Sequence, residues 1–136
     1  KIKAIAEEAR QSVVDNGGPG WAGKYAMDFI ETAPPLIAVV GDPAKAGLGS
    51  LFGQKYGAMQ AASACIQNMM LAASDLGLES LWFTFFAPQK MQAALDIPEN
   101  LEIAGLIPIG KPKDALKAPP RKEAKVHQQR YPKSAT

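Results

Sequence analysis

The chain has 136 residues, of which nearly half are apolar, a formal net charge of +2, one cysteine and one histidine. This length and composition indicate one domain with one packed core, and the small charge does not indicate a nucleic-acid or membrane partner. A single cysteine excludes a disulfide framework, and with one imidazole we expect neither a metal site nor a Ser/His triad; Cys65, in an apolar run, predicts a buried thiol in a cytoplasmic protein.

The N-terminal segment has the pattern of a helix. Apolar residues recur at helical spacing from Ile2 to Val13. The Asn-Gly-Gly of residues 16–18 is a typical helix stop, because glycine accepts a positive φ easily. The first residue is Lys1 rather than Met, so we expect the chain to begin within a longer protein, either through processing or because an N-terminal portion lies outside this sequence. Residues 24–32 fit a short helix or an irregular segment.

A strand and a long helix are predicted next. Leu36–Val40 is a continuous apolar run bounded by proline and glycine, which is typical of a strand covered on both faces. Residues 43–57 resemble a loop. The following segment has no charged residue before Asp75 and is rich in alanine, so we expect a central helix that is packed closely on several sides. Gly77 ends this helix.

The remaining core elements alternate in the same way. Residues 81–86 predict a strand, and Pro88 suits the first turn of a helix that runs to about Leu95. Residues 101–109 alternate and are broadly apolar, which indicates a third strand. This order of helices and strands favours a layered α/β or α+β domain with helices on both faces of the sheet.

An aromatic segment, Ser-Leu-Trp-Phe-Thr-Phe-Phe-Ala-Pro at residues 80–88, is the first candidate for chemistry. It lies where a strand meets a loop, and backbone N–H groups at such a place can contact a ligand. From the pattern alone, core packing is the favoured interpretation, since aromatic side chains commonly fill a sheet–helix interface. On the helix taken as buried, Gln67 and Asn68 need partners from a loop or a ligand. The glycines of residues 47–53 match no nucleotide-binding signature.

The last quarter of the chain is basic and rich in proline. Its first five cations are Lys111, Lys113, Lys117, Arg121 and Lys122. Such cations can hold a phosphate by charge-assisted hydrogen bonds, although the charge pattern alone favours a solvated tail. The prolines at 119 and 120 stiffen the segment and reduce the entropy lost on docking. We therefore divide the chain into a core, residues 1–112, and an extended arm, residues 113–136.

Three segments taken together resemble the FMN-dependent nitroreductase family. They are residues 33–42 (Ala-Pro-Pro-Leu-Ile-Ala-Val-Val-Gly-Asp), residues 62–88 with Gln-Asn, Leu-Ala-Ala and Gly-Leu-x-Ser-x-Trp, and residues 95–112 with an Ile-Pro turn and a Gly-x-Pro exit. Residues 119–131 are similar to the closing basic segment of the family. The order and spacing of these pieces make the resemblance specific.

This resemblance implies a fold, an assembly and an activity. The fold is an α+β, three-layer α/β/α sandwich with a mixed, mainly antiparallel sheet. The assembly is an intertwined homodimer with two FMN sites at the subunit interface, in which the extended C-terminal arm wraps around the partner. The activity is that of an FMN-dependent oxidoreductase, with ping-pong hydride transfer from NAD(P)H through FMN to a nitroaromatic, quinone or similar acceptor. No side chain need act as an acid or a base, because the cofactor carries the chemistry.

The resemblance also implies which residues bind the cofactor. Phe83–Phe86 fall on the loop whose backbone approaches flavin N5, and Arg121 and Lys122 fall near the phosphate-binding cations, a role that Lys117 could share. The full set is Phe83, Thr84, Phe85, Phe86, Gly110, Lys117, Arg121 and Lys122.

The chain departs from the family at two places. Many members have small residues or Glu-Gly where this chain has Thr84 and Phe85, and a phenylalanine there could crowd the flavin or stack on a substrate. The N-terminal Arg-x-Ser-x-Arg segment of the family, which contacts the flavin, has no counterpart in this sequence. Either another polypeptide segment completes the site or this chain does not hold FMN tightly. Two alternatives therefore stay open: a truncated or degenerate, non-catalytic dimeric relative that binds flavin or is structural, or another branch of the family, such as a dehalogenase or a flavin-consuming enzyme.

Overall fold

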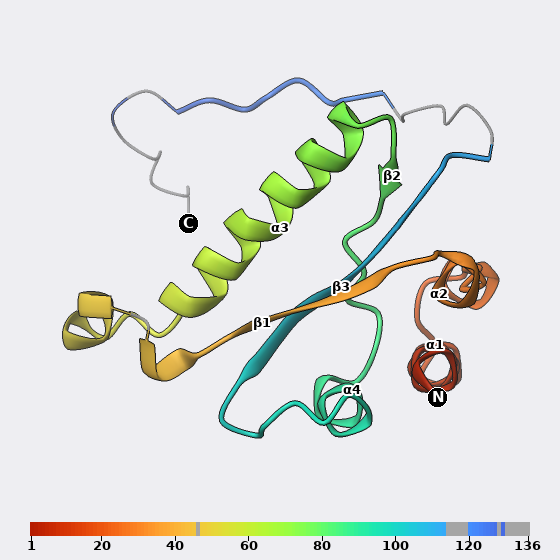
Figure 1. Ribbon diagram of the computed structural model, residues 1–136, viewed down its shortest axis with the longest axis horizontal. Helices are drawn as coiled ribbons and strands as arrows, with labels where there is room; N and C mark the ends of the chain where they lie inside the picture. The colour runs from red at the N-terminus through yellow and green to blue at the C-terminus, as the bar shows by residue number, and fades with distance from the viewer. Residues whose placement is uncertain (46, 114–119, 128, 130–136) are drawn as a thin grey trace, which may run out of the picture.

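The computed structural model describes residues 1–45, 47–113, 120–127 and 129. In chain order the elements are α1 (Ile2–Asp15), η1 (Ala22–Lys24), α2 (Phe29–Thr32), β1 (Leu36–Gly41), η2 (Pro43–Lys45), η3 (Gly47–Phe52), α3 (Gly57–Asp75), β2 (Glu79–Ser80), α4 (Pro88–Ala94) and β3 (Glu102–Gly110). Figure 1 shows α3 on one side of the crossing strands β1 and β3, and α1, α2 and α4 on the other side. The α+β class with helices on both faces of a sheet is thereby confirmed.

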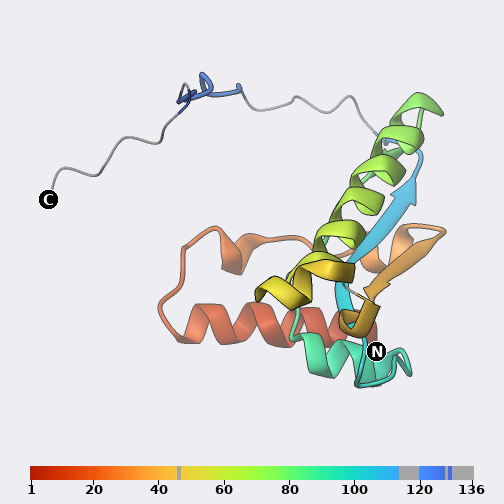
Figure 2. The same cartoon turned by 90° about the vertical axis from the view of Figure 1, so that its left-hand side faces the viewer.

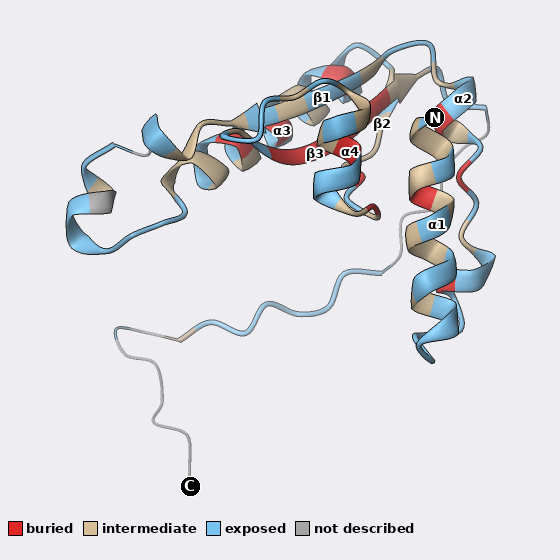
Figure 3. Ribbon diagram, turned by 90° about the horizontal axis from the view of Figure 1, so that it is seen from below, coloured by how far each residue is buried: buried red, intermediate tan, exposed pale blue. Residues whose placement is uncertain are grey.

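The sheet has three strands in the order β1-β3-β2, and both pairings are antiparallel. The central strand β3 pairs Pro108 with Leu36 of β1 and Gly110 with Glu79 of β2. Its apolar run is almost continuous because it is covered on both faces, and the buried colour concentrates along it in Figure 3. A bulge interrupts its ladder with β1 at Ala104, which has no partner in β1.

Two hydrophobic clusters fill the two faces of the sheet. On the side of α1, α2 and α4 the buried residues are Ala6, Met27, Ile30, Phe83, Phe86, Met91, Ile103 and Leu106. On the side of α3 they are Ala62, Ile66, Ala104 and Ile107. Because successive residues of a strand face opposite ways, Leu106 and Ile107 of β3 serve different clusters. Each fully buried aliphatic side chain contributes about 1.5–3 kcal/mol relative to an exposed one.

Glycines end the two long helices, as predicted. After α1, the Gly17 N–H donates to Val14 O over 3.0 Å and the Gly18 N–H donates to Val13 O over 2.8 Å, while Gly17 has a φ of +71°. This is a Schellman motif, in which a left-handed residue lets two N–H groups satisfy the last carbonyls of the helix. Gly77, with a φ of +70°, takes the same position after α3.

Polar contacts tie α1 to the segment that follows it. The Lys3 Nζ lies 2.9 Å from a carboxylate oxygen of Asp28 and 2.9 Å from one of Glu31. These hydrogen bonds, first that to Asp28 and then that to Glu31, raise the pKa of Lys3 above its ordinary value. The Arg10 Nη1 donates to the Tyr25 carbonyl over 3.0 Å. Residues 24–32 are thus a short helix, α2, preceded by a segment held against α1.

The prediction that Leu36–Val40 is covered on both faces was wrong. The strand exists, but it lies at the edge of the described sheet, and Ile37 and Val40 are 36% and 40% exposed. An apolar run predicts a strand without saying which of its faces other elements cover. Residues 43–57, predicted as a loop, contain the short helices η2 and η3.

The predictions about the surroundings of α3 were also wrong. Its buried residues are Ala62, Ile66 and Ala73, so one face packs on the sheet and other residues of the helix are exposed. Cys65 is exposed rather than buried, and Gln67 and Asn68 are exposed too, so water can satisfy their amides. No helix in the described part of the chain has the length and apolar character needed to cross a membrane.

Candidate functional site

The aromatic segment makes a single bridge to the sheet and then leaves it. The Phe83 N–H donates to Leu106 O and the Leu106 N–H donates to Phe83 O, both over 2.9 Å. The strand predicted over residues 81–86 was therefore wrong in extent, because the regular strand β2 covers only Glu79–Ser80. The chain turns away after Phe83 and enters α4 at Pro88.

Two backbone donors at this turn are available to a ligand. Among the described residues, no carbonyl or side chain accepts a hydrogen bond from the N–H of Thr84 or of Phe85. The next N–H, that of Phe86, donates to Thr84 O over 2.9 Å. Because backbone N–H groups are strong donors that require a partner, the pair at residues 84 and 85 is suited to acceptor atoms outside the segment.

The phenylalanines of the segment turn toward the cluster that includes α1 and α4. Phe83 and Phe86 belong to this cluster, and the half-buried Phe85 packs against it. The core interpretation of these aromatics is therefore correct for Phe83 and Phe86. Thr84, by contrast, is exposed.

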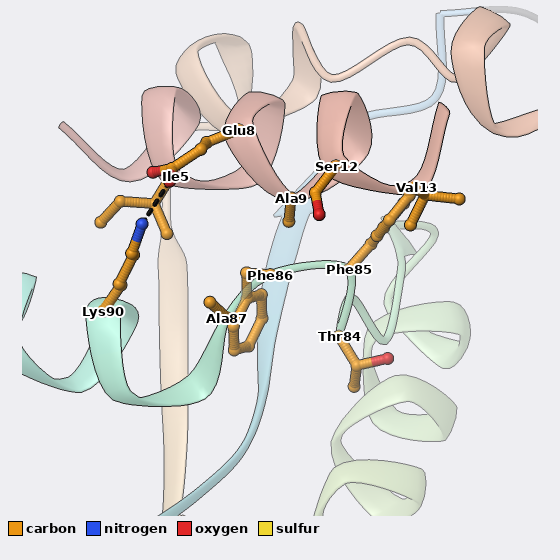
Figure 4. Close-up of a pocket in the computed structure, with 10 residues that line it drawn as sticks. All are labelled: Ile5, Glu8, Ala9, Ser12, Val13, Thr84, Phe85, Phe86, Ala87 and Lys90. Carbon is orange, nitrogen blue, oxygen red and sulfur yellow. Dashed lines mark hydrogen bonds and ion pairs between the residues drawn. The ribbon is translucent and has the colours of Figure 1, made fainter. Parts of the chain in front are cut away.

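A cleft of about 360 Å³ lies between α1 and this segment. Figure 4 shows the side chains of α1 on one wall and Phe85, Phe86 and Ala87 on the other. An ion pair between Glu8 of α1 and Lys90 of α4 lies beside it. The cleft is lined by Ile5, Glu8, Ala9, Ser12, Val13, Thr84, Phe85, Phe86, Ala87 and Lys90.

A tryptophan fixes the chain just before the turn. The Trp82 Nε1 donates to the Ala104 carbonyl over 3.0 Å, and its ring lies over Gly105, where an added Cβ would stand 2.5 Å from Nε1. The Phe85 ring is contacted by Trp21 and Tyr25. The sequence predicted neither these contacts nor the hydrogen bond of Trp82. The available signal was weak: Trp21 is an aromatic residue placed shortly after a glycine-rich helix stop.

Three other predicted cofactor residues, Gly110, Arg121 and Lys122, lie away from this segment in the chain. Gly110 stands at the far end of β3, four residues beyond Leu106, which is about 13 Å along a strand. Arg121 and Lys122 are exposed, on a stretch that extends away from the helices and sheet in Figure 2. Lys117 lies outside the described residues. The structure thus brings Phe83–Phe86 together and leaves Gly110, Arg121 and Lys122 apart from them.

The fold is shared with several solved flavoproteins. A structure of oxidized iodotyrosine deiodinase bound to FMN and 3-iodo-L-tyrosine superposes with a TM-score of 0.77 at 18% identity, covering 96% of this chain and 69% of that chain. An FMN-dependent nitroreductase of Clostridium difficile R20291 superposes with a TM-score of 0.60 at 22% identity, covering 80% of this chain and 65% of that chain. At these identities the likeness concerns the fold alone.

Two further relatives are closer in sequence over shorter spans. A nitroreductase family protein of Clostridium novyi NT shares 29% identity with a TM-score of 0.57, covering 64% of this chain and 48% of that chain. A protein of Archaeoglobus fulgidus, provisionally named NADH dehydrogenase/NAD(P)H nitroreductase, shares 35% identity over 60 residues, which are 41% of this chain. The matched part spans 34% of that curated relative.

The family model of the nitroreductases matches residues 2–111. This match takes in all the described helices and strands, including the turn with the two available N–H groups. It ends just before the arm, so the arm cations lie outside it. The chain belongs to the nitroreductase family.

Proposed function

We propose that this chain is an FMN-dependent NAD(P)H oxidoreductase that works as a homodimer. Membership of the nitroreductase family supports an oxidoreductase. The observation that carries the proposal is the turn at Thr84 and Phe85, where two neighbouring N–H groups have no acceptor among the described residues. The N5 and O4 edge of a flavin would present two neighbouring acceptors to such a pair.

Several residues of the chain would hold FMN. The N–H groups of Thr84 and Phe85 would donate to the ring, within the Phe83–Phe86 turn. Gly110, which carries no side chain, would leave the end of β3 open to close approach. The phosphate would be bound through charge-assisted hydrogen bonds by the partner's Arg121 and the partner's Lys122, a role that Lys117 would share.

The chemistry that FMN supplies when bound is two-electron hydride transfer, from NAD(P)H in one half-reaction to a nitroaromatic, quinone or similar acceptor in the next. The residues of this chain orient the ring and exclude water from one side of it. The Thr84 and Phe85 N–H groups would also stabilise negative charge on the ring edge that they face. Phe83 and Phe86, both buried, keep the turn dry on its inner side.

Flavin uptake tests this proposal directly. Purified protein should show the flavin absorbance bands, or gain them on adding FMN, and NAD(P)H should bleach them. The variant Arg121→Gln/Lys122→Gln should raise the Kd for FMN by roughly ten-fold or more, since a hydrogen bond to a charged group contributes about 1.5–3 kcal/mol. The matched control is Lys125→Gln, a third exposed cation of the arm, which should leave the Kd unchanged.

Two results would contradict the proposal in different ways. Colourless protein that binds no added FMN would exclude a flavoprotein. Protein that binds FMN but is not bleached by NAD(P)H, dithionite being the positive control, would favour the non-catalytic flavin-binding alternative.

The homodimer is proposed from the exposed face of α3. Leu71 in α3 is 59% exposed, Leu76 just after the helix is 75% exposed, and no charged residue precedes Asp75 in the helix. An uncharged, largely apolar helix face of this kind is typical of a surface covered in an assembly. We propose that α3 of a second copy covers it and that the arm, residues 113–136, wraps around that copy.

Sedimentation velocity tests the assembly. Leu71→Glu should convert the dimer to a folded monomer, because it places a charge in the proposed interface. Val14→Glu, on the exposed side of α1, should leave the dimer intact. Removal of residues 118–136 should weaken the dimer, and a truncated protein with unchanged dimer stability would exclude the wrapping arm.

A further inference from the structure

Three aromatic rings close a triangle beside the turn. The ring centroids are 6.1 Å apart for Trp21 and Tyr25, 6.2 Å for Trp21 and Phe85, and 6.0 Å for Tyr25 and Phe85. Each distance lies in the range in which tilted and edge-to-face rings attract each other. The triangle joins residues that are about sixty positions apart in the sequence, so it is a tertiary contact.

The first two rings are held in place by α1 and its C-terminal stop. The Schellman motif at Gly17 ends the helix, and Trp21 follows Gly17 by four residues. The Arg10 side chain fixes the Tyr25 backbone through its carbonyl. Trp21 is nevertheless 61% exposed, so burial alone does not account for its position. Its side chain makes ring contacts with Tyr25 and Phe85, and its carbonyl accepts a hydrogen bond from the Lys24 N–H.

Phe85 depends on these contacts more than its neighbours do. Phe83 is fixed by two backbone hydrogen bonds to Leu106, and the Phe86 N–H is bonded to Thr84 O. The Phe85 N–H makes no hydrogen bond with any described residue. The Phe86 N–H bond to Thr84 O spans residue 85 and closes a three-residue turn, so the packing of the Phe85 ring sets how this turn is placed against the core.

The Phe85 ring is half-buried and turns toward the core. It packs with Trp21, Tyr25 and the cluster on the α1 side of the sheet. A bulky residue at position 85 is thus accommodated by the triangle and by the neighbouring cluster. The departure from the small residues of many relatives is compensated by Trp21 and Tyr25.

We infer that Trp21 and Tyr25 are positioning residues, which act through the Phe85 ring to hold the N–H groups of Thr84 and Phe85 in the orientation that a ligand requires. That the ligand is a flavin rests on the proposed function, whereas the positioning itself does not. The segment of residues 17–25, far from the turn in the sequence, thus positions the turn.

NMR relaxation of the full chain without cofactor tests the inference. In the wild type the backbone order parameters of Thr84 and Phe85 should be about 0.85, the value of a rigid backbone. In Trp21→Leu both order parameters should fall below about 0.6. Trp21→Phe keeps an aromatic ring and should restore rigidity. Phe52→Leu, which truncates an 82% exposed ring in η3, should leave both order parameters unchanged.

A second readout links the turn to its ligand. Trp21→Leu and Tyr25→Leu should each raise the Kd for FMN by roughly ten-fold, while circular dichroism shows that both variants are folded. Order parameters in Trp21→Leu equal to those of the wild type would overturn the positioning role, even if FMN binding were normal. If the wild type bound no FMN, the proposed function would fail, and the order parameters would still decide the positioning role.

Discussion

The indole of Trp82 compensates an irregularity in the sheet. Its Nε1 donates to the carbonyl oxygen of Ala104 over 3.0 Å, and Ala104 is the residue that the bulge in β3 leaves without a partner in β1. Ala104 is 6% exposed, so this residue has little access to water. Because buried backbone groups require a partner, this hydrogen bond stabilises the bulge. It also links the bulge in β3 to Trp82, the residue directly before Phe83.

Trp82→Phe should therefore destabilise the protein. The phenylalanine keeps a ring in the α3-side cluster but removes the donor, which should lower the free energy of unfolding by about 1–3 kcal/mol. Urea denaturation followed by circular dichroism measures this change. Tyr56→Phe removes a hydroxyl from an exposed ring and should stay within about 0.5 kcal/mol of the wild type. Equal stability of Trp82→Phe and wild type would show that the hydrogen bond contributes nothing.

Gly105→Ala should also be destabilising, for a steric reason. The added Cβ would lie 2.5 Å from Nε1 and 2.7 Å from Cδ1 of Trp82. These atoms belong to a ring fixed by its hydrogen bond, so relief requires movement of the ring or the strand, at a cost of about 1–3 kcal/mol.

A double-mutant cycle separates this clash from other effects. In a Trp82→Ala background the ring is gone, and Gly105→Ala should then cost much less than in the wild type. The difference is the coupling between the two sites, which for residues in contact is about 0.5–3 kcal/mol. The same cost of Gly105→Ala in both backgrounds would disprove the contact.

Local features of the fold were predictable from the sequence because short-range chemistry decides them. The stops at Gly17 and Gly77 follow from the conformational freedom of glycine, and the start of α4 follows from Pro88. The type of each long element was predictable from the composition, length and spacing of its apolar residues. The resemblance of residues 33–112 to a family then gave the layers and the antiparallel sheet.

Features that depend on neighbours could not be predicted in this way. The run Leu36–Val40 has the composition of a central strand but lies at an edge, and only the topology reveals this. The alanine-rich pattern of α3 could not show that Cys65 would be exposed. The contact between Trp21 and Phe85 joins distant segments without any local signal. The turn at residues 84 and 85 was placed by resemblance, whereas its free N–H groups became visible only from hydrogen bonding.

The left-handed residue after α3 provides a test of the helix stop. Gly77→Ala places a Cβ at a φ of +70°, where nothing lies within 4 Å of it. The expected loss of about 1–2 kcal/mol is therefore a backbone cost rather than a clash. Gly20→Ala also meets no atom within 4 Å, but its φ is not positive, so it should be neutral or slightly stabilising. The melting temperature should therefore fall in Gly77→Ala and stay unchanged or rise slightly in Gly20→Ala. Equal shifts of the two melting temperatures would contradict the left-handed stop.

The ion pairs of Lys3 predict a dependence of stability on pH. Its pKa is raised in the folded protein by hydrogen bonds to Asp28 and then Glu31, so folding favours the charged lysine. This contribution is fully present below the ordinary lysine pKa and is lost as the pH rises through the raised value. Lys3→Met should lower the urea midpoint by a constant amount from about pH 6 to about pH 9, and the difference from the wild type should shrink at more alkaline pH. The control Lys24→Met removes the same charge from a lysine with no ion pair among the described residues. If Lys24→Met lowered the urea midpoint by the same amount and with the same pH dependence, net charge and not the ion pairs of Lys3 would explain the effect.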